Sequence, residues 1–464
     1  MQEEITMKEK SKLSSFRFWL LIWGLGIAGQ LCWNMENQWF NTFVYAKIAK
    51  DPTIISWMVG ISAAATTFST FLSGTLSDRR GRRKRVVAAG YILWGVFTIL
   101  FGMTQYITKG HLETSSQLLM IAGIAVVSAD AIMSFFGSMG NDGGFNAWAN
   151  DMMTDSNRGQ IGAAMATQPV IGTLVGTVVG GILVGKNDNY MRLFVAMGVL
   201  VILFGIFALL FMEESPNLVS NRQGSFWRQF FSAFNFKRYF SLKELVWVNL
   251  TLAVYFIAFN MYFTHMGNYI IYYLGFTADM MGLIEGIPLV LSMLLVIPAT
   301  KLINKNKSPL VCMASIILNF AGVLILGFYG KPENVNPSTI FNWVLLLAVF
   351  LVGSGYIVIL QTLTVWSKQL YPADSRGQFE GIRILFFVLI PMVAAPIISN
   401  PIIKQSGKFI DEYGFTEYLP THTLFLVASG LVLLTFIPLV FAKKYHNSRI
   451  SASKTIGNKP FVDK

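Results

Sequence analysis

Twelve long apolar runs, separated by short polar stretches, constrain the fold of this sequence more strongly than any other feature does. Each run is long enough for a helix to cross a hydrocarbon layer of about 30 Å. The runs are 18–44, 54–77, 86–103, 118–148, 160–185, 191–212, 245–273, 281–301, 309–329, 340–367, 378–400 and 421–442. The sequence therefore predicts an all-α membrane protein with twelve transmembrane helices.

Composition excludes several other classes of protein. Charged residues make up 13% of the 464 residues, about half the share found in soluble proteins. The net charge is +12, but the bases lie in loops between apolar runs, which indicates contact with anionic lipid and no nucleic-acid partner. Cys32 and Cys312 lie inside apolar runs and predict no disulfide. Motifs for nucleotide binding, zinc proteolysis or serine hydrolysis are absent, so we expect neither an enzyme nor a cofactor.

The basic loop 79–85 orients the chain. Six of its seven residues are Lys or Arg, and such loops stay on the cytoplasmic side of a membrane. With this loop inside, both termini are cytoplasmic, and most of the 36 Lys and Arg fall in cytoplasmic segments. We expect a monomeric, multi-pass protein of the cell membrane.

The chain divides into two halves. Residues 213–244 are polar and aromatic, and they indicate a cytoplasmic linker between an N-terminal bundle, 1–212, and a C-terminal bundle, 245–464. The segment 155–160, Asp-Ser-Asn-Arg-Gly-Gln, recurs as Asp-Ser-Arg-Gly-Gln at 374–378, after the tenth run. Because parallel repeats are typical of transporters, we predict two pseudo-symmetric six-helix bundles.

The residues around the basic loop follow the pattern GxxxDRxGR[RK]. They are Gly74, Asp78, Arg79, Gly81, Arg82 and Arg83. The pattern resembles the signature between helices 2 and 3 of the major facilitator superfamily, which implies a transporter whose two bundles rock about a central site. In physical terms, Gly74 allows another helix to approach closely, and Asp78 can meet a helix N-terminus. The alternative is a charge cluster that only holds helices 2 and 3 in place.

Five amides lie on one face of the helix expected over 18–44. They are Gln30, Asn34, Asn37, Gln38 and Asn41. Amides in lipid must be hydrogen-bonded, so this amide stripe faces protein or water. We predict that it lines a cavity for a hydroxyl-rich ligand; the alternative is that it joins neighbouring helices. Glu36 points roughly 140° away from the stripe, so it faces another helix or indicates an irregular one.

The run 118–148 carries carboxylates among amides and small residues. Intramembrane carboxylates mark ion or proton pathways because an unpaired one is expensive. We predict that Asp142, Glu36 and Asp130 couple transport to a cation. Asp142 can exchange a proton or ligate sodium; the alternative is a structural salt bridge.

The segment 142–145, Asp-Gly-Gly-Phe, resembles the DxP[FY] element of the glycoside-pentoside-hexuronide cation symporters. The resemblance implies that Asp142 helps to bind the coupling cation. This sequence departs from that family at several positions. Thr66 and Thr70 stand where the family has an acidic pair on helix 2. Ile27 stands where the family has an Asp on helix 1, and Met392 where it has a Lys on helix 11.

A second resemblance concerns the end of the repeat in the C-terminal half. Arg376-Gly-Gln378 and Glu380-Gly381 resemble the branch that holds the sucrose transporters, which implies coupling to protons rather than to sodium.

Other polar or aromatic residues in the runs are candidates for substrate binding. They are Asn146, Trp148, Gln168, His265, Asn268, Tyr269 and Gln361. The aromatic stripe of the run 245–273 can pack against helices or stack on sugar rings. We expect His265 to be a packing residue, with a proton relay as the alternative. Glu285 lies near the outer end of its run, where solvent or a salt bridge is expected.

Charged residues near the cytoplasmic ends of the runs predict a gate. Besides the loop residues Gly74, Asp78, Arg79, Gly81 and Arg82, the gate includes Arg158, Arg376, Glu380 and Arg383. We expect Asp78 to meet the helix that begins near Arg376 and to latch the cytoplasmic side. Glu380 and Arg383 can pair on one helix face.

These residues together predict a proton-coupled symporter of a di- or oligosaccharide or a glycoside that works by alternating access. The alternatives are an exporter of amphipathic drugs or lipids that uses the aromatic stripe, and a non-transporting sensor with the same fold. The sugar hypothesis depends on Asn34, Asn41, Asp142 and Asn146 meeting in one wet cavity.

Overall fold

The computed structural model describes residues 2–108, 116–154, 157–215, 218, 220, 224–232, 236–372, 376–411 and 414–457. Within these residues, twelve helices are long and apolar enough to cross a membrane. The predicted number of transmembrane helices is confirmed. Cys32 and Cys312 are free and buried.

Six spans form the N-terminal half. They are α1 (Gln2–Lys47), α2 (Pro52–Arg80), α3 (Lys84–Met103), α4 (Ser116–Gly140) with α5 (Asn146–Asp151), α6 (Arg158–Val184) and α7 (Tyr190–Phe211). One π-helical turn, η2 (Asn141–Phe145), joins α4 to α5, and a 3-10 turn, η1 (Thr104–Tyr106), follows α3. Asp51 caps the start of α2 by accepting from the Thr53 amide at 2.8 Å, and Gly81 ends α2 with a left-handed φ of 62°.

Six further spans form the C-terminal half. They are α10 (Lys243–Asn268) with η3 (Tyr269–Tyr273), α11 (Ala278–Met293) with α12 (Val296–Asn304), α13 (Ser308–Tyr329), α14 (Trp343–Gln369), α15 (Arg376–Ile384) with η5 (Leu385–Leu389) and α16 (Ile390–Ser406), and α17 (His422–Leu434) with α18 (Phe436–Gly457). The turns η3 and η5 are π-helical, and η4 (Pro332–Asn334) is a 3-10 turn.

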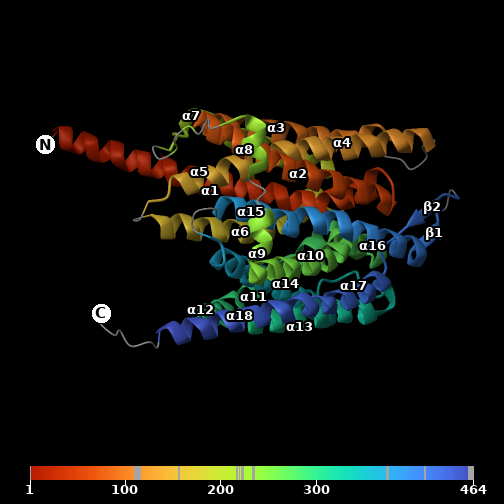
Figure 1. Ribbon diagram of the computed structural model, residues 1–464. Coiled ribbons are helices and arrows are strands. Elements are labelled where there is room, and N and C mark those ends of the chain that lie inside the picture. The colour runs from red at the N-terminus through yellow and green to blue at the C-terminus, as the bar shows by residue number, and fades with distance from the viewer. Residues whose placement is uncertain are drawn as a thin grey trace.

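The two halves lie side by side as two bundles whose helices run in one general direction (Figure 1). The start of α1 and the end of α18 lie at one end, which we call the terminal face and which also carries the α2–α3 loop, 81–83. The opposite end, the distal face, carries the loop 48–51 and an antiparallel hairpin of β1 (Lys408–Ile410) and β2 (Thr416–Tyr418). The bundles meet where α1 packs on α10, α6 on α11 and α2 on α16.

Small residues set the distances between helices within a bundle. A Cβ atom on Gly90 of α3 would lie 2.4 Å from Gly140 Cα on α4. A Cβ on Gly95 would lie 2.4 Å from the Gly198 carbonyl on α7. Glycine at these positions therefore lets the helix backbones touch.

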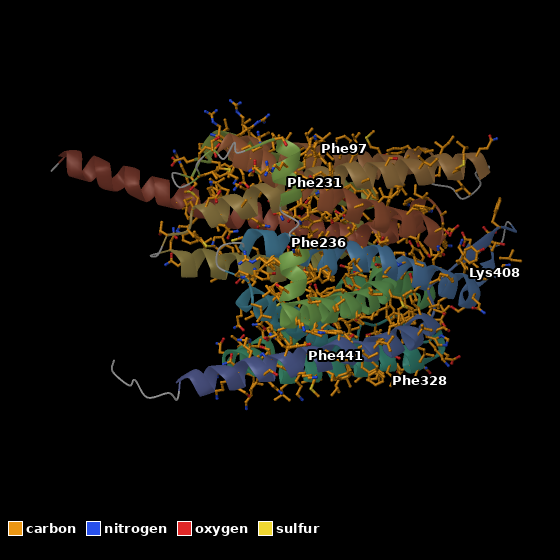
Figure 2. All side chains as sticks on the ribbon, viewed as in Figure 1. Phe97, Phe231, Phe236, Phe328, Lys408 and Phe441 are labelled. Carbon is orange, nitrogen blue, oxygen red and sulfur yellow. The ribbon has the colours of Figure 1, made fainter. Side chains whose placement is uncertain are left out.

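Large apolar side chains cover the outside of both bundles. Figure 2 shows Phe97, Phe328 and Phe441 on the periphery, and Phe328 is 66% exposed. A hydrocarbon environment suits such a surface, whereas water would not.

Two short helices lie between the halves, α8 (Phe226–Ser232) and α9 (Phe236–Ser241). They run across the bundles rather than along them (Figure 1). Phe230 of α8 packs against Phe68 and Phe71 of α2, while Phe231 and Phe240 are exposed.

The duplication predicted from the loop repeat also relates two tryptophans. Trp148 and Trp366 each stand ten residues before the arginine of the repeated motif. Both are buried at the terminal face, and both indoles donate a hydrogen bond: Trp148 to the Glu213 carbonyl and Trp366 to Glu244 Oε1, each at 2.8 Å.

Candidate functional site

Three acidic residues lie along one side of the N-terminal bundle. Glu36 on α1 bonds to Ser134 of α4, which stands one helical turn after Asp130 and about two turns before Asp142 on η2. Glu36 and Asp142 are partly exposed, whereas Asp130 is buried. The three residues predicted to couple transport to a cation therefore share one region of the bundle.

The π-helical turn η2 holds Asp142 in a network of neutral donors. Ser138 Oγ donates to Asp142 Oδ2 at 3.1 Å, and Asn141 Nδ2 donates to Oδ1 at 2.9 Å. Ser138 also lies 2.5 Å from Thr70 Oγ1 on α2, so α2 and α4 both position the carboxyl. π-helical turns are often found at functional sites because the extra residue turns side chains away from the regular helical face.

Glu36 and Asp130 share a serine. Ser134 Oγ lies 2.9 Å from Glu36 Oε1 and 2.8 Å from the Asp130 carbonyl oxygen, and Ser62 of α2 lies beside the Asp130 carboxyl. In the described part of the chain, Glu36 Oε2 and Asp130 Oδ1 are buried without a hydrogen-bond partner.

None of the salt bridges between described residues involves Glu36, Asp130 or Asp142. The three carboxyls also do not form a group that could hold a metal ion. Three acids without a cation cannot all be ionised at low cost in an apolar bundle, so the arrangement favours protonated forms.

The amide stripe of α1 is divided between two environments. Asn34, Gln38 and Asn41 are buried, and Asn34 Nδ2 donates to Thr177 Oγ1 on α6 at 3.2 Å. Gln30 and Asn37 are partly exposed. The side chains of Asn34 and Gln38 therefore join helices, which was the alternative role of the stripe. Asn34 and Asn41 are buried, whereas Asp142 and Asn146 are partly exposed, so the four residues do not share one environment among the described residues, and the substrate site proposed below uses Gln30, Asn37 and Asn146 instead.

Polar contacts close the distal face between the bundles. Gln38 Nε2 on α1 donates to Glu285 Oε2 on α11, and Asn268 Nδ2 on α10 donates to the Asn41 carbonyl at 3.1 Å. At the rim, Lys50 pairs with Glu417 of β2 at 2.8 Å. Glu285 was expected in solvent or a salt bridge; it bonds instead to a neutral amide of the other bundle.

Ring faces of the C-terminal bundle form an aromatic group near the bundle interface. Tyr356 of α14 stacks on Phe259 of α10 with ring centroids 4.4 Å apart, and Phe387 of η5 meets Phe256 edge-on at 4.6 Å. Tyr356 and Phe387 are partly exposed. The buried Arg383 guanidinium lies over the Phe387 ring at 5.3 Å.

The other residues predicted to bind substrate are dispersed. In the N-terminal bundle, Gln168 donates to the Ile22 carbonyl at 2.9 Å, and Trp148 contacts Glu213. In the C-terminal bundle, His265 lies 3.4 Å from Ser399, and Tyr269 donates to the Gly330 carbonyl at 2.6 Å. Gln361 donates to Thr300 at 2.7 Å. Asn146 is partly exposed. Trp148 lies at the terminal face, so it stands apart from the three carboxyl groups.

Arg83 is the centre of the basic loop. Its guanidinium pairs with Asp78 at 2.6 Å and with Asp151 at 2.9 Å, and its backbone amide donates to Glu214 Oε2 at 2.7 Å. Asp78, which was expected to latch onto the other bundle, therefore pairs within its own bundle in this structure. Arg83 was part of the sequence pattern, although it was not among the residues assigned to the gate.

The remaining gate residues differ in their surroundings. Arg79 donates to the Gly224 carbonyl of the linker at 2.9 Å, and Arg82 is exposed. A Cβ on Gly74 would meet nothing within 4 Å, so the side of α2 to which it would point is open at this position. The side chains of Arg158, Arg376 and Glu380 lie outside the described residues.

Two residues that contact the predicted site residues could not be identified from the sequence. Tyr91 of α3 donates to Asn141 Oδ1 and so steadies the partner of Asp142. Thr177 of α6 donates to Gln38 Oε1 at 2.8 Å. Neither contact could be found from spacing, because each joins helices that are distant in the chain.

Comparisons with known proteins agree on one fold. Residues 22–396 match the model of the Major Facilitator Superfamily. A bacterial homolog of the human lysosomal transporter Spinster, in an inward-facing conformation, is similar with a TM-score of 0.66 and 14% identity over 94% of this chain and 98% of that one. A point mutant of the nucleoside transporter NupG has a TM-score of 0.64 and 15% identity over 91% and 99%. A D-xylose-proton symporter has a TM-score of 0.63 and 14% identity over 90% and 97%. No curated protein matches the sequence.

Proposed function

Because the chain belongs to the Major Facilitator Superfamily, we propose that it is a proton-coupled secondary transporter of a sugar or glycoside that works by alternating access. The single observation that carries the coupling is the group of Glu36, Asp130 and Asp142, three acidic residues of one bundle in which Glu36 bonds to Ser134, between the other two along the chain, with no salt bridge to any of them among the described residues. The resemblance of the Arg376 region to the sucrose transporter branch supports the same choice of ion.

Asp142 and Glu36 exchange the coupling proton in this scheme. Both residues are partly exposed, although Glu36 Oε2 is buried, while Asp130 is buried and raises the cost of a second negative charge. Protonation removes a charge that would otherwise oppose the movement of the bundle against its partner. Neutral donors around Asp142, namely Ser138 and Asn141, can bond to either protonation state.

The substrate lies between the bundles in this scheme. Gln30, Asn37 and Asn146 offer amides from the N-terminal bundle, and Tyr356 and Phe387 offer ring faces from the C-terminal bundle. Amides match sugar hydroxyls as donors and acceptors, and ring faces stack on sugar C–H groups. Two of the similar structures belong to transporters of hydroxylated solutes, a D-xylose-proton symporter and a nucleoside transporter.

The terminal face is assigned to the cytoplasm because it carries the basic loop 79–85. The polar contacts that join the bundles at the distal face then close the extracellular side. Gly74 has open space beside it, as expected for a glycine that meets another helix only after the bundles close on the cytoplasmic side.

Transport by purified protein in proteoliposomes tests the proposal. A panel of labelled mono-, di- and oligosaccharides is offered under an imposed proton gradient and, separately, under a sodium gradient. We expect a proton gradient to drive uphill uptake of a sugar, and Asp142→Asn to abolish that uptake while counterflow exchange continues. Asp188→Asn, in the α6–α7 loop, is the matched control and should transport normally.

Unchanged uphill uptake by Asp142→Asn would eliminate the coupling role of this residue. Uptake driven by sodium alone would contradict proton coupling. Transport of cationic amphiphiles without transport of any sugar would support the exporter instead.

A further inference from the structure

Glu285 is an acidic residue that the coupling scheme leaves unused. Its Oε2 accepts a hydrogen bond from Gln38 Nε2 of the other bundle. Thr177 Oγ1 donates to Gln38 Oε1 at 2.8 Å, so α1, α6 and α11 are tied together at one point. Among the described residues, Glu285 Oε1 is buried and has no hydrogen-bond partner. A carboxylate held by one neutral amide is unfavourable in such a place, whereas a protonated carboxyl is tolerated.

The bundles are tightly packed around this contact. A Cβ on Gly282, one turn before Glu285, would lie 2.7 Å from the Thr177 carbonyl on α6. A Cβ on Gly286 would lie 2.7 Å from Val178. Glu285 as a whole is partly exposed, but its Oε1 is buried, so this oxygen becomes accessible to water only if α11 moves away from α6 and α1.

Other titratable groups on the elements packed against α11 face different partners. The tyrosine hydroxyls near this end have partners of their own: Tyr269 donates to the Gly330 carbonyl, Tyr272 donates to the Thr42 carbonyl, and Tyr273 bonds to His422. Tyr356 stacks on Phe259, and Glu36 bonds to Ser134. Lys301 and Lys368 lie near the terminal ends of α12 and α14. Asp279 lies six residues earlier on α11 itself. In the part of the chain that the structure describes, no salt bridge reaches Glu285.

We propose that Glu285 is a protonation switch for the distal gate: the carboxyl is protonated while the bundles are closed on Gln38, and it loses its proton to water when they separate. The inference rests on the proposed transport function and extends it to the regulation of the gate. Because the closed state holds one more proton than the open state, low pH favours closure and high pH favours opening. The ratio of closed to open protein can then change by at most about tenfold per pH unit, the limit for a single proton.

The test measures the gate directly, without substrate. Nitroxide labels are attached to Asn187→Cys and Ser338→Cys, exposed positions in distal loops of the two bundles, and the distance distribution is recorded by double electron–electron resonance in nanodiscs across a pH series. Cys32 and Cys312 are buried, so the introduced cysteines can be labelled selectively. We expect the short-distance population to fall as pH rises in the otherwise unchanged protein. In Glu285→Gln it should stay high at every pH, because glutamine keeps an acceptor for Gln38 and cannot ionise.

Two further variants separate the explanations. Asp142→Asn should keep the pH response of the gate although it loses proton-driven uptake, so a failure of the transport proposal and a failure of the switch give different results. Gln38→Leu removes the donor from the closed state and should shift the transition to lower pH, which tests the contact if Glu285→Gln is poorly folded. A Glu285→Gln protein with the original pH response, or a Gln38→Leu protein with an unchanged transition, would overturn the proposal.

Discussion

The hydroxyl of Tyr91 on α3 donates a hydrogen bond to Asn141 Oδ1 at 3.0 Å. The same hydroxyl lies 2.8 Å from the Leu25 carbonyl on α1, so it joins three helices. Asn141 in turn donates to Asp142. Tyr91 therefore orients the amide that faces the coupling carboxyl, although it does not touch that carboxyl itself.

Replacing Tyr91 with Phe should slow transport without unfolding the protein. The loss of one buried hydroxyl costs about 1 kcal/mol of stability and frees the Asn141 side chain to rotate away from Asp142. We expect proton-driven uptake to fall about fivefold, a change of about 1 kcal/mol, with a smaller loss of exchange. Initial rates of both processes in proteoliposomes provide the measurement.

Tyr255→Phe is the matched control for this substitution. Tyr255 is a fully buried tyrosine whose hydroxyl has no hydrogen-bond partner among the described residues. Its removal should leave transport unchanged and should not lower the melting temperature. Equal losses in both variants would mean that the Tyr91 hydroxyl has no specific role.

Alanine substitutions at two glycines in neighbouring helices should change the stability of the protein in opposite directions. A Cβ on Gly90 would lie 2.4 Å from Gly140 Cα, so Gly90→Ala pushes α3 from α4 and should destabilise the protein by about 1–3 kcal/mol. A Cβ on Gly60 of α2 would meet nothing within 4 Å, so Gly60→Ala should stabilise the helix by about 0.5–1 kcal/mol. Thermal unfolding of the purified variants in one detergent gives the comparison, and equal shifts would show that the α3–α4 approach is looser than described.

Two neighbouring arginines of the basic loop should also differ in how much they contribute to stability. Arg83 is buried and pairs with Asp78 and Asp151, whereas Arg82 is exposed. Arg83→Gln removes both pairs and should destabilise the terminal face by about 1–3 kcal/mol, and Arg82→Gln should change stability by less than about 0.5 kcal/mol. Limited proteolysis of the linker and thermal unfolding would detect the difference; indistinguishable variants would contradict the central position of Arg83.

The number and order of the transmembrane helices could be predicted from the sequence because hydropathy is a local property. Asp142, Asp130 and Glu36 could also be singled out, since a carboxylate in an apolar run is costly wherever it faces. The partners of these residues could not be predicted. Gln38 was predicted to lie on the amide stripe, but its bond to Glu285 depends on how the two bundles meet, and no spacing in one helix contains that information.

The same limit applies to the basic loop and to the turns. Composition identifies a cluster of cations, but it does not say that Arg83 rather than Arg79 is enclosed by Asp78 and Asp151. The π-helical turn at Asp142 depends on packing against α2, where Gly143 comes within contact distance of Ser73. The distal hairpin of β1 and β2 was not predicted, because three-residue strands leave little periodicity in a sequence.

Two substitutions at Tyr356 should distinguish ring stacking from hydrogen bonding in substrate recognition. The ring stacks on Phe259 with centroids 4.4 Å apart, and Tyr356 is partly exposed. Tyr356→Phe keeps that ring, so it should retain the affinity for a transported sugar within about twofold to threefold. Tyr356→Leu removes the aromatic face and should weaken binding about fivefold to tenfold, since a ring face contributes about 1–1.5 kcal/mol. Titration calorimetry of the sugar against both variants gives the affinities, and Phe328→Leu, on the lipid-facing surface, should bind like the unchanged protein. If Tyr356→Phe loses as much affinity as Tyr356→Leu, the hydroxyl rather than the ring face recognises the sugar.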